Sequence, residues 1–474
     1  MESIWTGAAL PRFSPLRGEK RAEALVIGGG ITGLLAAYFL KRKGASPVVI
    51  EAGRIAGGVT KRTTAKITSQ HNLIYDQLRK SVGREKALQY ARANEQAIAV
   101  YAQLIEDERI DCDFERISTG LYATLNTDRL EAEYRAAQAL GLPARLDDQA
   151  PLPFRTRGIL VFENQAQFHP LKFLAHIAKD LEIYEETQAL SLEGGWVATA
   201  QGRIYADQII IATHFPFLNA PGYYFARMHQ ERSYVVAYEN AALPDGAYLG
   251  IDGGRYSIRR AGDYVLFGGG GHRTGENETG GKYDALLRAG GEYYTGARTV
   301  CRWSAQDCVT QNGIPYIGRF SASKENLYVA TGFRKWGMTS AMVSAMRLSD
   351  LLSGKRPDYD VFDPLRHGAA ASVPGFCADA AKSAAGLIKQ NFQIPTEKLE
   401  DIPPGQAGII ETSRGKTGVY KDETGEIHTV PAKCPHLGCQ LTWNGDERSW
   451  DCPCHGSRFD IRGNLLNGPA QRRN

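Results

Sequence analysis

Apolar residues near the N-terminus fall into two short runs separated by a longer one. Residues 24–27 and 48–50 are continuous apolar runs, and residues 34–40 between them read Leu-Leu-Ala-Ala-Tyr-Phe-Leu. Short apolar runs predict buried strands, whereas a longer run that opens after a glycine-rich turn predicts a helix. Residues 23–51 are therefore predicted to form a strand, a helix and a second strand.

The middle of the chain alternates between helical and strand-like patterns. Helices are predicted at 71–82, 84–107, 127–140 and 168–181. Strands are predicted as a pair near 112–125, and singly at 234–238, 256–259 and 264–267. Such interleaving predicts an α/β Rossmann-like domain built from separate pieces of chain and an α+β domain on a mostly antiparallel sheet.

The last quarter of the chain is predicted to be a separate small all-β domain. Residues 363–374 are rich in Pro, Gly and Ala, which is typical of a linker, and Pro403-Pro404-Gly405 opens the strands that follow. The predicted division is 21–100, 155–215 and 300–365 for the Rossmann-like domain, 101–154 and 216–299 for the antiparallel-sheet domain, 366–394 for a linker with a helix, and 395–474 for the small domain.

Composition fits this division and narrows the class of protein. Of 474 residues, 43% are hydrophobic and 23% are charged, which suits two or three packed domains. The net charge is only +4, and no long basic run points to nucleic acid. No apolar stretch reaches the roughly 18 residues of a membrane span, and residues 1–20 lack the apolar core of a signal peptide. A cytoplasmic protein without a membrane span is therefore expected.

Two boxes of cysteine and histidine lie in the small domain. The first reads Cys434-Pro-His436-Leu-Gly-Cys439, and the second reads Cys-Pro-Cys-His-Gly-Ser over 452–457, with fifteen residues between His436 and Cys452. Two thiolates and two imidazoles at this spacing can hold the two irons of a [2Fe–2S] cluster unequally. A structural zinc site is the alternative, but zinc needs four ligands and leaves one cysteine of each box unexplained.

Both boxes resemble those of Rieske proteins of the cytochrome bc type, and this resemblance covers about residues 395–474. It implies a [2Fe–2S] cluster with the ligands Cys434, His436, Cys452 and His455. It also implies a disulfide between Cys439 and Cys454 over the cluster. An iron–sulfur cluster carries single electrons, so the rest of the chain is expected to supply or receive them.

A dinucleotide fingerprint lies at the other end of the chain. Gly28-Gly-Gly30-Ile-Thr-Gly33 follows the first apolar run and opens the predicted helix, and Glu51 lies eighteen residues beyond the last glycine. The glycines allow a tight turn, a close approach to a pyrophosphate and close packing of the helix on the strand, and the acid can accept ribose hydroxyls. The fingerprint serves FAD and NAD alike.

Three later segments favour FAD. Residues 301–307, 313–318 and 330–339 read CRWSAQD, GIPYIG and ATGFRKWGMT. Together they resemble the C-terminal FAD segments of the D-amino-acid oxidase-like flavoproteins, the group of glycine, sarcosine and gamma-glutamylputrescine oxidases. The resemblance covers about residues 22–365 and implies that FAD is bound there.

The same resemblance assigns parts of the site to shorter segments. It implies a strand at 327–331, a glycine turn under the flavin ring, and a helix at 337–352 whose N-terminus stabilises negative charge on the reduced flavin. Residues 57–68 match the loop along the flavin, although Thr-Thr-Ala-Lys replaces the more usual Gly-Ser-Arg-Asn-Gly. Residues 183–189 match the strand near adenine, and 208–213 match the strand that closes the Rossmann-like layer.

These matches supply the candidate site residues. The residues expected to bind FAD are Gly28, Gly30, Ile31, Thr32, Gly33, Glu51, Ala52, Thr63, Thr64, Ala65, Lys66, Ala189, Ala212, Thr213, Gly332, Phe333, Lys335, Trp336, Gly337, Met338 and Thr339. The candidates for substrate chemistry are Arg259, His272, His71 and Lys335. Arg259 could hold a carboxylate, His272 and His71 could act as an acid or base, and Lys335 could meet flavin N5 through a water. Each has an ordinary alternative as a surface or packing residue.

The two resemblances together predict an FAD-dependent oxidoreductase. An amine or amino acid is expected to be oxidised at its C–N bond by hydride transfer to flavin N5, and single electrons then leave through the cluster to a ferredoxin, cytochrome or quinone. One alternative is a reductase or oxygenase-type component that passes electrons inward to the flavin, and another is a pure electron carrier. A large sheet domain over the flavin disfavours a carrier, and the lack of a second GxGxxG disfavours a reductase driven by NAD(P)H. A homo-oligomer is left open.

The residues beside the second box predict the potential of the cluster. Ser457 matches the position where Rieske proteins place a hydroxyl donor, but Phe459 lacks the phenol donor of the high-potential relatives. Hydrogen bonds to the sulfurs raise the potential. We expect a midpoint potential below respiratory Rieske centres and above ordinary ferredoxins, measured by redox titration. A couple as high as a respiratory centre would contradict this.

Overall fold

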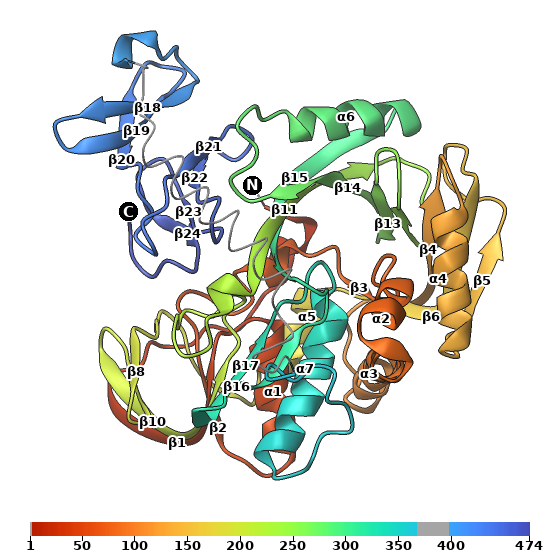
Figure 1. Ribbon diagram of the computed structural model, residues 1–474, viewed down its shortest axis with the longest axis horizontal. Coiled ribbons are helices and arrows are strands. Elements are labelled where there is room, and N and C mark those ends of the chain that lie inside the picture. The colour runs from red at the N-terminus through yellow and green to blue at the C-terminus, as the bar shows by residue number, and fades with distance from the viewer. Residues whose placement is uncertain (1, 367–397) are drawn as a thin grey trace.

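The computed structural model describes residues 2–366 and 398–474 (Figure 1). Two large sheets with surrounding helices form the main body, and two short sheets form a smaller part at the C-terminal end. This arrangement confirms the expected fold class of an α/β layer, an antiparallel-sheet layer and a small all-β part. The predicted linker and helix at 366–394 lies outside the described residues, except for Arg366.

The first sheet is mostly parallel and contains the N-terminal strand. Its order is β16–β17–β10–β1–β2–β7, with the β8–β9 hairpin beside β10. Only β16 and the hairpin run antiparallel to their neighbours. The strands are β1 (Gly18–Ile27), β2 (Pro47–Ile50), β7 (Glu182–Tyr184), β8 (Ser191–Glu193), β9 (Trp196–Ala198), β10 (Gly202–Ile211), β16 (Tyr316–Ser321) and β17 (Lys324–Thr331).

Both faces of the first sheet are buried, which explains the continuous apolar run in β1. Ala24 and Val26 face the largest core, while Leu25 and Ile27 face a second core on the other side. Helices α1 (Ile31–Arg42) and α7 (Gly337–Leu352) lie together on the first of these faces (Figure 1). The remaining helices are α2 (Tyr75–Ser81), α3 (Gly83–Asp107), α4 (Asp128–Ala139), α5 (Pro170–Ile177) and α6 (Lys282–Tyr293).

The second sheet is curved and largely antiparallel, in the order β15–β11–β14–β13–β12–β4–β6–β3 with β5 beside β6. Only β4 and β12 pair in parallel. The strands are β3 (Lys66–Ile67), β4 (Glu115–Ala123), β5 (Ala144–Asp147), β6 (Gly158–Gln167), β11 (Met228–Glu239), β12 (Ala247–Gly250), β13 (Ser257–Ala261), β14 (Tyr264–Arg273) and β15 (Arg298–Thr310).

The two faces of the second sheet have different neighbours. On β11, Val235 and Ala237 join the largest core, whereas Tyr234 and Val236 pack in a separate core that includes residues of α6. We call the face of Val235 the inner face and the face of Tyr234 the outer face. Side chains alternate along a strand, so successive residues of β11 and β15 point in turn to the inner face and the outer face.

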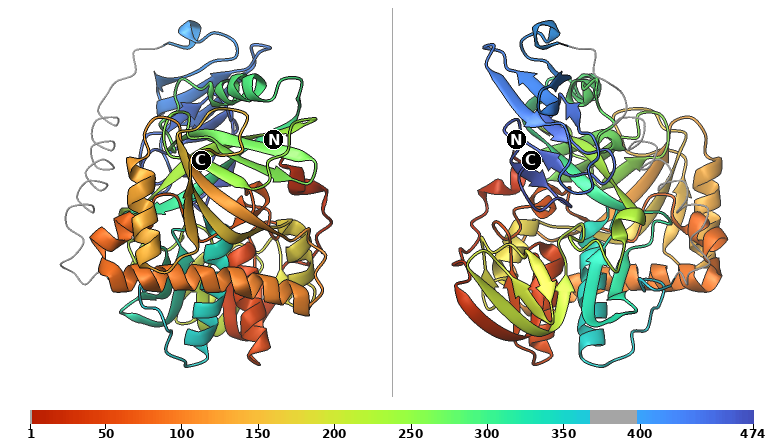
Figure 2. Two further views of the ribbon diagram at one scale, coloured as in Figure 1. Left: turned by 90° about the vertical axis from the view of Figure 1, so that its right-hand side faces the viewer. Right: turned by 60° about the vertical axis from the view of Figure 1, so that its left-hand side comes forward.

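The C-terminal part consists of two short sheets with a small core of their own. One sheet is β18–β19–β20 and the other is β21–β22–β23–β24. The strands are β18 (Ala407–Thr412), β19 (Gly415–Lys421), β20 (Ile427–Pro431), β21 (Thr442–Asn444), β22 (Ser449–Asp451), β23 (Arg458–Phe459) and β24 (Leu465–Asn467). In both views of Figure 2 the blue strands of this part lie beside the green strands of the second sheet.

Several local predictions differ from the structure. The range 112–125 contains one strand, β4 (Glu115–Ala123), and not a strand pair, because β4 hydrogen-bonds with the distant strands β6 and β12. The helix predicted at 71–82 begins at Tyr75. The predicted domain boundaries stay a prediction, and β6 and β15, from ranges assigned to the Rossmann-like domain, hydrogen-bond in the second sheet.

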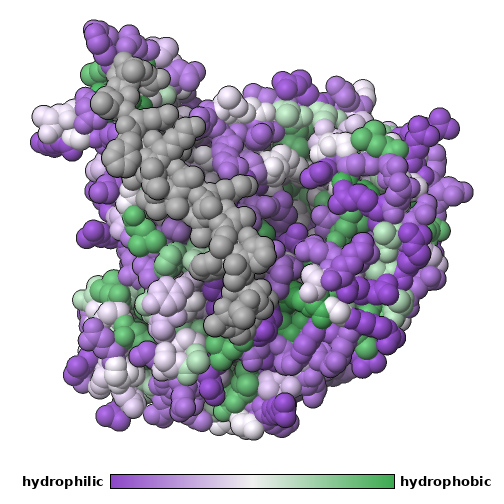
Figure 3. Space-filling view, in the orientation of Figure 1, coloured by the Kyte–Doolittle hydropathy of each residue, from purple (hydrophilic) through white to green (hydrophobic). Residues whose placement is uncertain are grey.

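No helix within residues 2–366 and 398–474 has the length and apolar character needed to cross a membrane. Hydrophilic residues cover most of the face seen in Figure 3, and hydrophobic residues appear there in small separate groups.

Candidate functional site

The turn between β1 and α1 brings two stretches of backbone into close contact. An added Cβ at Gly33 would lie 1.9 Å from the carbonyl oxygen of Gly28, so only glycine fits. Gly30 occupies the N-cap of α1 and offers no side-chain cap to the first N–H groups of the helix. Such groups at a helix N-terminus bind phosphate. The turn therefore fits the pyrophosphate of a dinucleotide.

Glu51 lies directly after β2, beside this turn. Its carboxylate accepts the backbone N–H of Gly29 at 2.7 Å and that of Gly53 at 2.9 Å. Each carboxylate oxygen keeps a lone pair that could accept a hydroxyl hydrogen of a ribose. The position and contacts of Glu51 thus fit the acidic residue of a dinucleotide site.

The turn after β17 is held by the loop at 63–68 and by β15. The hydroxyl of Thr339 donates to the carbonyl of Thr68 at 2.8 Å, and the N–H of Arg334 donates to the carbonyl of Cys308 at 2.8 Å. Trp336 is the N-cap residue of α7. The predicted flavin loop, the flavin turn and the second sheet are therefore in contact with one another, and we call the region where they meet the flavin-side space.

Cationic side chains converge on the flavin-side space. The Lys66 Nζ donates to the Ser257 hydroxyl at 2.8 Å, and the Arg259 guanidinium donates to the carbonyl of Thr64. Arg259 is buried and Lys66 is half-buried, and among the described residues neither forms a salt bridge with a carboxylate. Burial, with the charges of Arg259 and Lys335, lowers the pKa of Lys66 to about 7. A buried and a half-buried cation without a carboxylate partner favour an anionic ligand.

Two carboxylates lie on the inner face of the second sheet. Glu231 of β11 and Asp307 of β15 are directly paired across the strands. A Glu231 oxygen lies 3.7 Å from the Nζ of Lys335, and the hydrogen bond from His229 lowers the pKa of Glu231 to about 2. Asp307 is buried, and burial raises its pKa to about 7. A carboxyl group that titrates near neutral pH can exchange a proton with a bound ligand.

The two histidines predicted for substrate chemistry have other surroundings. Both ring nitrogens of His71 are hydrogen-bonded, to the Tyr90 hydroxyl at 2.5 Å and the Thr68 carbonyl at 2.7 Å, and its ring stacks on Trp336. Burial lowers the pKa of His71 to about 3. His272 stacks on Tyr234 and therefore lies with the outer face. Arg259 and Lys335 thus both lie at the flavin-side space, and His272 does not. His71 packs against Trp336 and the Thr68 carbonyl and so helps to hold the segments around this space.

The two cysteine–histidine boxes meet at the tip of the C-terminal part. Cys434 and Cys452 are buried, and the hydrogen bond between their thiols lowers the pKa of Cys434. The imidazoles of His436 and His455 lie 5.0 Å apart at an interplanar angle of 89°. The Nδ1 atoms of both rings are buried and have no hydrogen-bond partner among the described residues. Two thiols and two free imidazole nitrogens fit a mixed thiolate–imidazole metal site.

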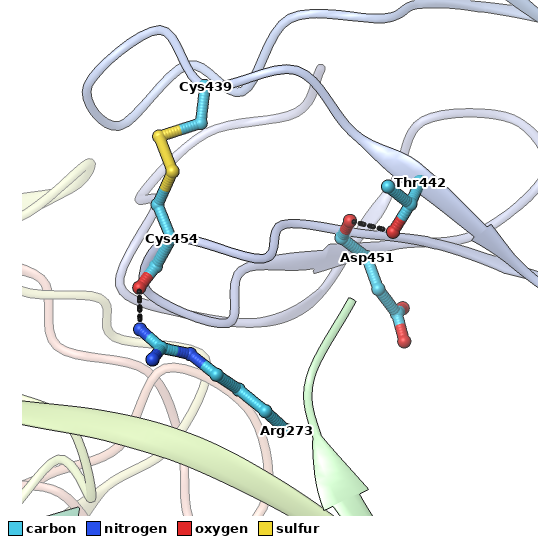
Figure 4. Close-up of a disulfide and its surroundings, with 5 residues drawn as sticks. All are labelled: Arg273, Cys439, Thr442, Asp451 and Cys454. Atoms are coloured by element: carbon cyan, nitrogen blue, oxygen red, sulfur yellow. Dashed lines mark hydrogen bonds between the residues drawn. A yellow bond between two sulfur atoms is a disulfide. The ribbon is translucent and has the colours of Figure 1, made fainter. Parts of the chain in front are cut away.

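A disulfide joins the two boxes. Cys439 of the first box is bonded to Cys454 of the second, with the Cα atoms 6.5 Å apart (Figure 4). The sulfur of Cys452 lies within 4.8 Å of both disulfide sulfurs. The carbonyl of Cys454 accepts a hydrogen bond from Arg273 of the second sheet at 3.5 Å. The two extra cysteines are thus used in the disulfide and are not available as thiolate ligands.

A buried group of charges attaches the C-terminal part to the outer face of β11 and β15. Glu447 Oε2 accepts from Arg232 at 2.7 Å and from Ser304 at 2.6 Å, and an Arg458 nitrogen lies 3.3 Å from the same oxygen. Arg458 also bonds Asp451 at 2.9 Å. Burial favours the neutral form of Glu447, but the two arginine charges outweigh it, so its pKa lies below the usual value. We call these five residues the interface charge group.

Both box histidines face the main body. His436 Nε2 lies 2.8 Å from the Asn219 Oδ1, and the Phe225 ring meets His436 and His455 edge-on at 6.2 and 5.5 Å. An amide oxygen can only accept, so Nε2 carries the proton of His436 and Nδ1 keeps its lone pair for a metal. The contact therefore selects the tautomer that the metal site requires.

Sequence reasoning missed the residues that join the two parts. They are Asn219, Phe225, Gln230, Arg232, Gln306 and Glu447. It also missed Asp307, which lies on the inner face and does not join the two parts. Asp307 lies in a segment that was matched to flavoproteins, and an acid in a buried strand was a usable signal. The others carry no sequence pattern, because their partners lie more than 140 residues away along the chain.

Comparisons with known proteins agree with both halves of this picture. Residues 23–351 match the family model described as FAD dependent oxidoreductase, and residues 393–473 match the Rieske [2Fe-2S] domain. A putative Rieske 2Fe-2S iron-sulfur protein of Bacillus subtilis, YhfW, is 38% identical over 99% of this chain and 96% of its own length.

More distant relatives match the main body alone. Gamma-glutamylputrescine oxidoreductase of Escherichia coli is 24% identical over 75% of this chain and 89% of its own length. The crystal structure of glycine oxidase from Geobacillus kaustophilus superposes with a TM-score of 0.63 and 19% identity, over 73% of this chain and 99% of that one. This structural likeness shows a shared fold.

The glycine turn yields a first structural prediction. Changing Gly33 to Ala should cost about 1–3 kcal/mol of unfolding free energy and abolish dinucleotide binding, because the new Cβ strikes the Gly28 carbonyl. Urea unfolding and the flavin absorbance of the purified protein measure the two effects. Gly291→Ala in α6 is the control, since no atom lies within 4 Å of its added Cβ. A Gly33→Ala protein with full flavin content would refute this account of the turn.

Proposed function

Because the chain belongs to the family of FAD-dependent oxidoreductases and carries a C-terminal Rieske [2Fe-2S] domain, we propose that it oxidises a small amine or amino acid and exports the electrons singly. It is an oxidoreductase of the amino-acid oxidase type, with FAD and a [2Fe-2S] cluster as cofactors. When bound, FAD accepts two electrons with a hydride, and the cluster carries one electron at a time. An external one-electron acceptor completes the proposal.

The donor set supports both cofactor assignments. The turn at Gly28–Gly33 and Glu51 would hold the pyrophosphate and ribose of FAD, and the flavin ring would lie in the flavin-side space. Cys434, Cys452, His436 and His455 would hold the cluster. The other two cysteines of the boxes form the disulfide, Asn219 occupies Nε2 of His436, and the Nδ1 atoms of both histidines have no partner among the described residues.

The charges of the flavin-side space suit a substrate with a C–N bond. Lys66 and Arg259 would bind the carboxylate of an amino acid, or another anionic group of an amine substrate. Asp307 would take the proton that an ammonium group must lose before its nitrogen lone pair can assist hydride loss. Lys335, paired with Glu231, would close the space beside the flavin turn.

One observation carries the proposed electron path: β15 touches both sites. Its Cys308 carbonyl accepts from Arg334 of the flavin turn at 2.8 Å, and Gln306, two residues earlier, reaches the second box at 2.8 Å. The imidazoles of the cluster site also point at the main body through Asn219 and Phe225. A short path of this kind supports direct exchange between the flavin and the cluster.

Electrons could use the same path inward, as in a reductase or oxygenase-type component. The anionic and cationic groups of the flavin-side space favour the outward direction, because they provide for an organic substrate at the flavin. A pure electron carrier has no use for them.

Anaerobic mixing with a panel of amines and amino acids tests the proposed function. A substrate should bleach the flavin absorbance first, and loss of the cluster's visible absorbance should follow. The Cys434→Ser protein, expected to lack the cluster, should bleach its flavin with the same substrate and then stop. Bleaching without any change at the cluster would overturn the electron path, and reduction only by a ferredoxin or NAD(P)H system would favour the inward direction.

The lowered pKa of Lys66 predicts how anion binding depends on pH. Lys66 is cationic below about pH 7 and neutral above it, so a simple carboxylate such as acetate should bind more weakly as the pH rises through 7. The loss should be roughly tenfold, and a perturbed flavin spectrum reports the Kd.

Lys66→Met is the matched variant for this prediction. It should bind acetate weakly at every pH and show a smaller step near pH 7, because Asp307 in the same region also ionises there. A step of the same size in Lys66→Met would show that another group controls the binding.

A further inference from the structure

Two glutamines of the main body hold the backbone of the second box. The amide of Gln230 donates to the carbonyl of His455 at 2.6 Å, and the amide of Gln306 donates to the carbonyl of Gly456 at 2.8 Å. The two side chains are linked, because Gln306 Nε2 also donates to Gln230 Oε1 at 2.6 Å. We call them the glutamine pair. We propose that this pair raises the reduction potential of the cluster and fixes its electronic contact with the flavin turn.

The glutamine pair is buried, so its orientation is determined by its neighbours. Gln230 is 2% exposed and Gln306 is 1% exposed. Gln306 Oε1 lies 3.1 Å from an Arg232 nitrogen, and a guanidinium has only donors. The atom of Gln306 that faces Arg232 is therefore the oxygen, and the amide nitrogen faces the second box. Arg232 is held in turn by Glu447, so the interface charge group sets the direction of the amide.

The second box is packed directly on the pair. Gly456 has a φ of 82°, and an added Cβ there would lie 2.7 Å from the Cβ of Gln230. Only glycine lets the box approach the strand this closely. Gln230 Nε2 also lies 3.1 Å from the carbonyl of Gly468, so it holds two segments of the Rieske domain at once.

The hydrogen bond to Gly456 acts on the peptide unit beside the cluster ligands. In a trans peptide the N–H of Ser457 points opposite to the Gly456 carbonyl. A donor on the carbonyl polarises the unit, which makes that N–H more positive. The Ser457 carbonyl accepts the N–H of Cys452 at 2.8 Å, and the Ser457 hydroxyl is hydrogen-bonded to Cys434. Positive polarisation next to both thiolates stabilises the more negative, reduced cluster and so raises its potential.

The same strand carries the contact onward to the flavin turn. Between Gln306 and the Cys308 carbonyl there are two peptide units, and that carbonyl accepts from Arg334. Val309, the next residue, forms a β-bridge with Phe333. The second box, Gln306, β15 and the flavin turn are therefore connected by two hydrogen bonds and one short stretch of chain. This second role depends on the proposed function, whereas the effect on the potential does not.

Three variants of the full-length holoprotein test the inference. Gln306→Leu removes the donor, Gln306→Glu keeps the length but replaces the donor by an acceptor, and Gln230→Leu removes the partner amide. Gln311→Leu, near the end of β15, is the matched control, because its amide donates to the carbonyl of Ala226 instead. Iron content, the EPR spectrum of the reduced cluster and its midpoint potential from a mediated titration are measured for each protein.

The midpoint potential should shift to more negative values in Gln306→Leu and further in Gln306→Glu, and stay unchanged in Gln311→Leu. After substrate reduction of the flavin, electron transfer to the cluster should be roughly tenfold slower in Gln306→Leu. If Gln306→Leu loses its iron, the midpoint potentials of Gln306→Glu and Gln230→Leu test the inference in its place, and both should shift to more negative values.

Unchanged potentials in all iron-containing variants of the pair would overturn the inference. The titration uses chemical mediators and no substrate. A failure of the proposed function, seen as a wild-type cluster that no substrate reduces, would therefore leave the shift in potential still measurable. A shifted potential with an unchanged transfer rate would show that the glutamine pair raises the potential of the cluster but does not determine its electronic contact with the flavin turn.

Discussion

The alternation of side chains along β11 and β15 is the constraint on which both sites depend. A strand presents successive residues to opposite faces, so Glu231 and Asp307 face the flavin-side space while Arg232 and Gln306 face the Rieske domain. One pair of strands thus lies between the flavin-side space and the Rieske domain and contributes residues to both candidate sites. A shift of register by one residue would exchange the two sets and destroy both sites at once.

Burial of charge at this pair of strands makes the docking specific. The side chains of Arg232, Arg458 and Asp451 are almost fully buried, and Glu447 is nearly so. A buried ion pair contributes little net stability, but removal of one partner costs about 3–5 kcal/mol. The interface charge group therefore adds little net stability to this placement of the Rieske domain, but it makes other placements, which would leave a buried charge without its partner, much less stable. It also orients the amide of Gln306, which links the docking geometry to the environment of the cluster.

The flavin-side space contains side chains of both charges. Lys66 and Arg259 lie without a carboxylate partner among the described residues, and burial holds the pKa of Lys66 near 7. Asp307 and Glu231 lie on the neighbouring strands β15 and β11 of the same sheet, where burial raises the pKa of Asp307 and a hydrogen bond lowers that of Glu231. Such charges suit a substrate with an anionic and a cationic group. They also explain why His71, fully hydrogen-bonded and neutral, serves as support.

The sequence alone determined the parts whose chemistry is local. The glycine turn with Glu51 lies within a short segment, where spacing and residue type suffice. The helix at 337–352 and the expected ligands in the two boxes also lie within short segments, whose motifs resemble those of known families. The order of strands, the single strand at 115–123 and the placement of His272 on the outer face were not available from the sequence, because each depends on pairing with distant chain. Only the tertiary structure decided which residues connect the flavin side to the cluster. Asn219, Gln230, Gln306 and Glu447 are ordinary polar residues until folding buries them against partners far along the chain, and burial is what makes their hydrogen bonds specific.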